Sequence, residues 1–106
     1  MNTDFHDAKY KDLTEKIIKI FYKVYNNLGY GFLEKVYENE VIGEYFADIL
    51  VDNKVIVEIK ASKSLAVENE AQLLNYLKAT DIEVGLLLNF GPKPDFKRKV
   101  FDNIRK

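Results

Sequence analysis

The stretch YFADILVDNKVIVEIKA, residues 45–61, decides the fold of this 106-residue chain. Two β-rich runs, residues 44–51 and 54–61, cover it, and their β-branched and aromatic side chains favour strands. Asp52-Asn53 separates the two runs, and both residue types favour tight turns. The stretch therefore predicts a β-hairpin.

Three charged residues interrupt the apolar runs: Asp48 in the first, and Glu58 and Lys60 in the second. Charge inside a buried strand is costly unless it is paired or bound to a metal. Asp48, Glu58 and the backbone carbonyl of Ile59 can hold a divalent cation, while Lys60 can stabilise a phosphate or position a water. These residues therefore indicate the chemistry of a metal-dependent nuclease.

An interpretation without catalysis is also open. Asp48 and Lys60 can form an ion pair while Glu58 is solvated on an open face of the sheet. A bare D-x9-E-x-K pattern is common by chance, so the spacing alone does not decide between the two interpretations.

The register of the hairpin decides whether the two carboxylates share a face, because directly opposed residues point the same way. A two-residue loop would place Asp48 opposite Val57, on the wrong side. A three-residue loop, residues 52–54, would place Asp48 opposite Glu58. The metal interpretation therefore requires the odd-length loop or a bulge, in which Asn53 can adopt a left-handed conformation.

Three helices are expected around the hairpin. Residues 12–28 have apolar side chains at three- and four-residue spacing, and Gly29 is a plausible stop. A second helix is predicted to begin near Phe32 and to end at Gly43. A third covers residues 67–79, which again show helical spacing.

The remaining elements complete an α/β fold. Residues 84–90 are almost wholly apolar, which is typical of a strand buried on both faces. The strand–helix–strand order from residue 54 to residue 90 predicts a parallel crossover, and hence a mixed sheet flanked by helices. The tail from Asp95 fits both a strand and a helix. At this length we expect one domain, residues 1–106.

Composition restricts the metal chemistry and the partners. The chain has no cysteine and one histidine, His6, so the ligands of any metal must be oxygens, which favours magnesium, manganese or calcium. The net charge of −1 weighs against tight non-specific binding of DNA. No stretch is apolar enough to span a membrane and no signal-peptide pattern opens the chain, so the expected location is cytoplasmic.

Two pairs of residues on the predicted helices add to the candidate site. Gln72 and Tyr76 lie four apart on the third helix, and Glu34 and Tyr37 lie three apart on the second. Tyrosines at such spacing also serve core packing, and a glutamate in a first helical turn is favoured by the helix dipole. Neither pair specifies a function by itself.

Five stretches together resemble a known family: GFLEKVY at 31–37, FADILV at 46–51, IVEIKA at 56–61, EAQLLNYL at 70–77 and GLLLNFG at 85–91. The first fits the G-x-x-E-x-x-Y signature of the GxxExxY proteins. These are small bacterial members of the PD-(D/E)XK nuclease-like superfamily. The resemblance covers nearly the whole chain, and the ordered set is far more specific than any one stretch.

The resemblance implies a restriction-endonuclease-like core in which Asp48, Glu58 and Lys60 occupy the signature positions. Glu34 would be the acidic residue of the first core helix, supported by Tyr37. The Gln72-x-x-x-Tyr76 pair is similar to the Q-x-x-x-Y motif of RecB-like nucleases. The implied cofactor is Mg²⁺ or Mn²⁺.

One departure from the family pattern follows Tyr37. Family members usually continue through a long helix and an additional strand before the aspartate strand, a segment of roughly thirty residues that is absent here. We therefore expect a core that lacks one strand. The Asp48 strand would then be an edge that can pair with another chain.

Three interpretations of function remain. The first is a magnesium-dependent phosphodiesterase acting on DNA or, less favoured, RNA. The second is a catalytically inactive module that keeps the fold and binds nucleic acid or a protein. The third is a domain that forms a homodimer through the exposed edge strand.

Overall fold

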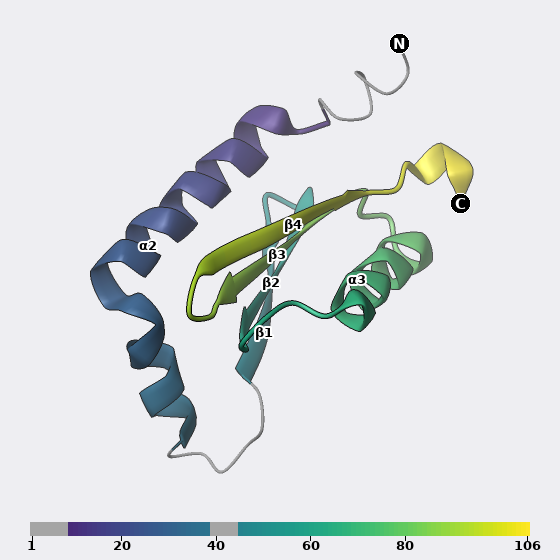
Figure 1. The fold of residues 1–106 in the computed structure, drawn as a ribbon. Helices are drawn as coiled ribbons and strands as arrows, with labels where there is room; N and C mark the ends of the chain where they lie inside the picture. The colour runs from purple at the N-terminus through teal and green to yellow at the C-terminus, as the bar shows by residue number, and fades with distance from the viewer. Residues whose placement is uncertain (1–8, 39–44) are drawn as a thin grey trace.

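The structure is a computed structural model that describes the backbone of residues 9–38 and 45–106 and the side chains of residues 9–28 and 48–106. Its elements are α2 (Lys11–Glu38), β1 (Tyr45–Val51), β2 (Val55–Ala61), α3 (Val67–Ala79), β3 (Val84–Phe90), β4 (Pro94–Val100) and a 3₁₀ turn, η1 (Asn103–Arg105) (Figure 1). Within the described ranges, no helix is both long and apolar enough to cross a membrane.

The four strands form one mixed sheet in the order β1-β2-β3-β4. β1 and β2 are antiparallel, β2 and β3 are parallel, and β3 and β4 are antiparallel. The crossover between the parallel strands is α3, as the strand–helix–strand order predicts. The α/β fold with a mixed sheet is therefore confirmed, and β1 lies at the edge of the sheet.

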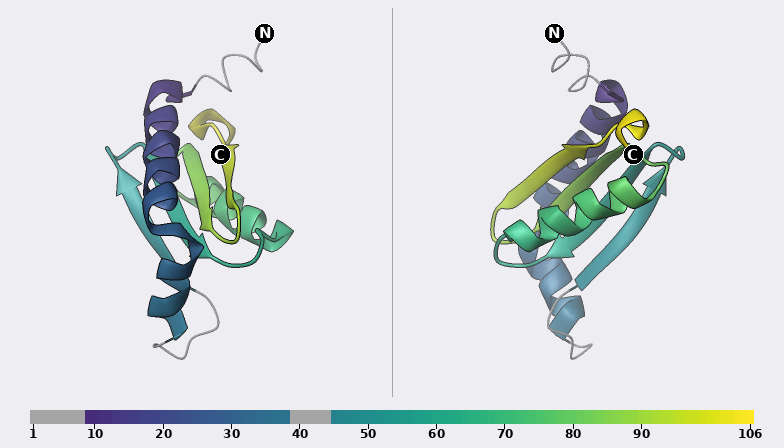
Figure 2. Two further views of the ribbon diagram at one scale, coloured as in Figure 1. Left: turned by 60° about the vertical axis from the view of Figure 1, so that its left-hand side comes forward. Right: turned by 90° about the vertical axis from the view of Figure 1, so that its right-hand side faces the viewer.

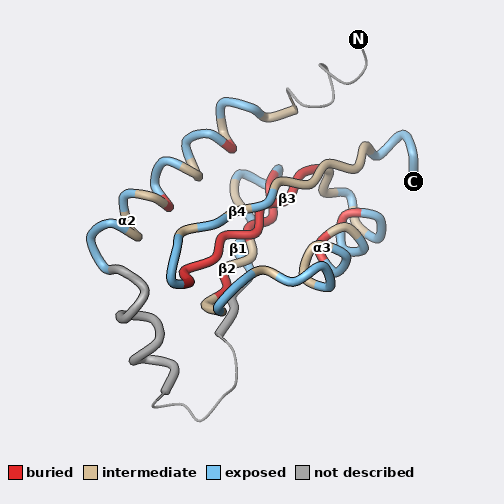
Figure 3. The backbone as a smooth tube through the Cα atoms, in the orientation of Figure 1, coloured by how far each residue is buried: buried red, intermediate tan, exposed pale blue. Residues whose placement is uncertain are grey.

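The two helices cover opposite faces of the sheet (Figure 2). On the α2 face, Phe21 packs in a cluster with the buried side chains of β2 and β3, and its ring meets that of Phe90 edge-on at 5.0 Å. On the α3 face, Leu73 and Leu77 pack against β2 and β3 side chains, among them Leu87. β3 serves both clusters, which explains why all its residues are apolar or buried (Figure 3).

The prediction of a helix stop at Gly29 is wrong, because α2 runs without a break from Lys11 to Glu38. A single glycine costs a helix only about 1 kcal/mol relative to alanine, and no proline interrupts this segment. The second predicted helix is thus the continuation of the first. Its expected end at Gly43 lies outside the described residues.

The tail that the sequence left open is a strand, β4. It pairs with β3 from Val84 opposite Val100 to Phe90 opposite Pro94. β3 needs this partner, since its backbone groups are buried and must be hydrogen-bonded on both sides. Proline is tolerated at the first residue of an edge strand.

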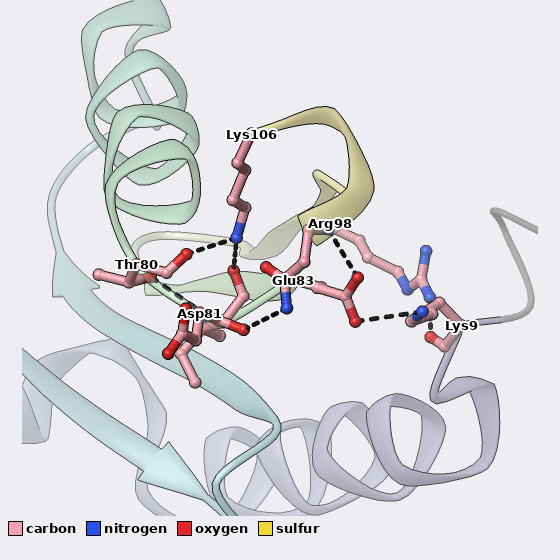
Figure 4. Close-up of polar contacts among 8 residues, drawn as sticks. Lys9, Thr80, Asp81, Glu83, Arg98 and Lys106 are labelled. Carbon is pink, nitrogen blue, oxygen red and sulfur yellow. Dashed lines mark hydrogen bonds and ion pairs between the residues drawn. The ribbon is translucent and has the colours of Figure 1, made fainter.

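A polar cluster, here called the clasp, fastens the segment after β4 to the loop that precedes β3 (Figure 4). The Glu83 carboxylate accepts hydrogen bonds from Lys9 Nζ at 3.1 Å and from the Asn103 backbone N–H at 2.7 Å. Lys106 Nζ donates to the backbone carbonyl of Thr80 at 2.6 Å. The clasp lies at the amino end of β3.

Candidate active site

The register of the β1–β2 hairpin is the one that a shared carboxylate site requires. Val51 pairs with Val55, and Asp48 pairs with Glu58. Because directly opposed residues of an antiparallel pair share a face, both carboxylates project to the same side of the sheet. The prediction of an odd-length connection is therefore confirmed.

The loop achieves this register with a tight turn and one extra residue. Asp52 and Asn53 have φ values of 53° and 56°, the left-handed conformation that a type I′ turn needs at both central positions. The Lys54 N–H donates to the Val51 carbonyl at 2.9 Å, which closes the turn. Lys54 is then one extra residue between the turn and β2, and because of it Val51 pairs with Val55 rather than with Lys54.

The carboxylates lie on the α3 face. Ile56 packs with α3, and residues two and four further along β2 point the same way, which places Glu58 and Lys60 on this face. The Ile59 side chain packs on the α2 face, so only its backbone can contribute to a site shared with Glu58. Asp48, from the edge strand, is exposed, whereas Lys60 is buried.

The electrostatic environment of Glu58 includes both Asp48 and Lys60. The pKa of Glu58 is raised above its usual value, first by burial and second by the neighbouring negative charge of Asp48, while the positive charge of Lys60 opposes the rise. A carboxylate held beside a like charge is destabilised, and a cation between the two would remove that penalty. The donor set of two carboxylates therefore fits a hard divalent cation.

No third acidic, histidine or cysteine side chain joins the two carboxylates in the part of the chain whose side chains are described. Glu34 and Tyr37 lie on the helical backbone of α2, but their side chains are outside the described ones.

Gln72 and Tyr76 are exposed residues of α3. Glu70 on the same helix forms an ion pair of 2.7 Å with Lys99 of β4. An α-helix turns by about 100° per residue, so Gln72 lies on the opposite side of the helix from Glu70. By the same count, Tyr76 lies about 120° around the helix from Glu70. Gln72 and Tyr76 therefore flank the β1–β2 half of the sheet, with no hydrogen bond to Asp48 or Glu58 in the described structure.

Asn89 is a buried polar residue to which the sequence assigned no role. It pairs with Lys60 across β2 and β3 and is 1% exposed. Its Oδ1 accepts from the Ser62 backbone N–H at 3.0 Å, and its Nδ2 donates to the Ser62 carbonyl at 3.0 Å. Asn89 thus fixes the chain just beyond Lys60. The sequence feature that could have indicated a structural role for Asn89 is its place as the single polar residue in an otherwise apolar strand.

The model of one protein family matches the chain, and its description is the PD-(D/E)XK nuclease superfamily. The match covers residues 11–41 and 37–99, so the two stretches together extend over most of the chain. They meet at residues 37–41, where the sequence departs from the GxxExxY pattern. No curated protein and no solved structure matches the chain.

Proposed function

Because the chain belongs to the PD-(D/E)XK nuclease superfamily, we propose that it is a divalent-metal-dependent nuclease that hydrolyses phosphodiester bonds of DNA. The observation that carries this proposal is the pairing of Asp48 with Glu58, with Lys60 on the same face of the sheet. The G-x-x-E-x-x-Y stretch at residues 31–37 supports a place among the GxxExxY proteins of that superfamily.

Asp48 and Glu58 would hold Mg²⁺ or Mn²⁺, and the backbone carbonyl of Ile59 would add an oxygen ligand. When bound, such a cation polarises the scissile phosphate and lowers the pKa of a coordinated water. Lys60 is buried beside Glu58, where a fixed positive charge acts strongly on charge that develops on the phosphate. Its role is to stabilise that charge or to position the attacking water.

The helices would supply the supporting residues. Glu34 is proposed as the acidic residue of the first core helix, with Tyr37 one turn further along it. Gln72 and Tyr76 flank the hairpin from α3, and their exposed side chains are available to a substrate lying on this face.

DNA is proposed as the substrate in preference to RNA. The protein is proposed to act in the cytoplasm, and residues 1–106 are proposed to form one domain. β1 is the strand at which two copies would pair, because it ends the sheet and exposes Ile49 and Leu50. An unpaired strand edge with apolar side chains favours pairing with another strand.

A cleavage assay tests the proposal. Single- and double-stranded DNA are incubated with the protein in Mg²⁺, in Mn²⁺ or in chelator, and products are resolved on a gel. We expect metal-dependent cleavage by the wild type and none by an Asp48→Asn, Glu58→Gln double variant. A folded wild-type protein that binds nucleic acid without cleaving it under any of these conditions would instead be a binding module.

A further inference from the structure

A pocket of about 510 Å³ opens at the carboxyl ends of β2 and β3. Its lining includes Lys63 and Ser64 from the loop after β2, Asn89 near the end of β3, and Lys93 and Asp95 beyond β3. Ligands of open α/β sheets commonly bind in the crevice outside the carboxyl ends of parallel strands. The volume is within the usual range for small-ligand sites.

The pocket adjoins the candidate active site. Asn89 pairs directly with Lys60, and neighbouring strands are about 4.8 Å apart. Both residues lie on the α3 face, since Asn89 is two positions from Leu87 and Lys60 is four positions from Ile56, and both of those residues pack there. A ligand in the pocket would therefore be one strand away from Lys60, on the face that carries Asp48 and Glu58.

The two loops that carry most of the lining residues are held by contacts within the chain. In the loop after β2, the Ser62 backbone and hydroxyl are hydrogen-bonded to the Asn89 side chain, the hydroxyl at 3.3 Å from Asn89 Oδ1. In the loop after β3, the Tyr25 hydroxyl of α2 donates to the Gly91 carbonyl. A Cβ atom at Gly91 would collide with the Ser62 carbonyl, so the two loops touch. A site that is already ordered loses less entropy when a ligand binds.

The lining favours an anion with hydrogen-bond acceptors. Lys63, in the loop after β2, and Lys93, in the loop after β3, are exposed lysines. Asp95 is the one carboxylate in the lining, which leaves one net positive charge. The Ser64 hydroxyl adds a donor. Lysine and serine side chains are common partners of the phosphate oxygens of nucleic acids, and such contacts position a strand without reading its sequence.

We propose that this pocket binds the phosphate backbone of the nucleic-acid strand whose scissile phosphate lies at Asp48 and Glu58. This inference rests on the proposed function and adds the path of the substrate. The strand crosses the end of β2 from the hairpin and continues between the loops that follow β2 and β3. Lys63 and Lys93 contact its phosphates from these two loops.

The test compares two charge-matched variants. In Lys63→Ala, Lys93→Ala both pocket lysines are removed, and in Lys16→Ala, Lys23→Ala two exposed lysines of α2 are removed instead. Binding of fluorescein-labelled oligothymidylate of about 20 nucleotides is measured by anisotropy in chelator over a series of salt concentrations. Circular dichroism checks that both variants are folded.

The pocket variant is expected to bind about tenfold more weakly at low salt, with the slope of log affinity against log salt reduced by about 1.4, which corresponds to two phosphate contacts on a single strand. The α2 variant is expected to bind like the wild type. Equal losses in both variants, no loss in the pocket variant, or no binding by the wild type would each overturn the assignment.

Cleavage in Mn²⁺ separates this inference from the proposed function. If the wild type does not cleave, and the pocket variant but not the α2 variant binds more weakly, the proposed hydrolysis is refuted and the proposed binding of nucleic acid in the pocket is supported. If the wild type cleaves and the pocket variant has an unchanged KM and affinity, the nuclease stands and the pocket is refuted.

Discussion

Glu58 is held between a like charge and an opposite charge. Asp48 faces it across the hairpin, and Lys60 lies two residues further along β2 on the same face. Burial and Asp48 together raise the pKa of Glu58, so the charged form of this carboxylate is disfavoured. A cation between the two carboxylates would remove that penalty, and its binding would then be linked to the stability of the fold through this residue.

Divalent cations should stabilise the protein through these two carboxylates. At a Mg²⁺ concentration about tenfold above Kd, binding to the native state adds about 1.4 kcal/mol, which raises Tm by roughly 5 °C. Differential scanning fluorimetry measures the shift. The Asp48→Asn, Glu58→Gln variant should show none, and the same response in both proteins would mean that the cation binds elsewhere.

Lys60 should matter to turnover more than to binding. Replacing it with methionine keeps the apolar stem in its buried position and removes the charge, so the fold should survive. Turnover is expected to fall about a hundredfold, on the order of 3 kcal/mol, because the lost interaction acts mainly in the transition state. Single-turnover kinetics and substrate Kd distinguish the two effects. A large loss of affinity with unchanged turnover would contradict the catalytic role.

At the scale of elements, the turn between β1 and β2 sets the register on which the site depends. Asn53 has a φ of 56°, which asparagine and glycine tolerate and alanine does not. Asn53→Ala should therefore lower the free energy of unfolding by about 1 kcal/mol, whereas Asn53→Gly should change it little. Urea denaturation measures both. Equal stability of the two variants would show that the turn conformation does not limit folding.

Local sequence patterns predicted some elements well. The bounds of α3 match those expected from helical spacing, and the hairpin has the register that a metal site shared by Asp48 and Glu58 would require. Both depend on residues close in sequence. The prediction of a helix end at Gly29 was wrong, because a single glycine costs a helix only about 1 kcal/mol relative to alanine and does not end it.

The features that could not be predicted depend on distant partners. β4 is a strand because β3, buried on both faces, needs a hydrogen-bonding neighbour. The role of Asn89 depends on Ser62, which lies 27 residues earlier in the chain. Neither partner is visible in a local window of sequence.

At the scale of the whole molecule, the clasp joins the segment before α2, the loop before β3 and the segment after β4. Its centre is Glu83. Burial alone would raise the pKa of this carboxyl, but the hydrogen bonds from Asn103 and Lys9 outweigh it and lower the pKa below 4.5. The folded chain thus binds fewer protons at Glu83 than the unfolded chain does.

Glu83→Gln should make stability less dependent on pH. Because the folded pKa is lowered, the stability that the carboxylate supplies is present above its unfolded pKa and is lost as the pH falls through the folded value. Urea unfolding should show the variant weaker than the wild type at neutral pH, with the difference in stability narrowing as the pH falls below the usual glutamate pKa. Glu15→Gln, at an exposed position of α2, is the control and should show no such convergence.

The position of β1 has a dynamic consequence. Among the side chains that the structure describes, the buried core residues come from α2, β2, α3 and β3, whereas Asp48, Ile49 and Leu50 of β1 are exposed. The β1 amides should therefore exchange with deuterium through local opening, faster than those of β3. Mg²⁺ bound between Asp48 and Glu58 would couple this strand to the core and slow its exchange, while β3 would be unaffected. Occupancy of the metal site would then control how often the outermost strand separates from the sheet.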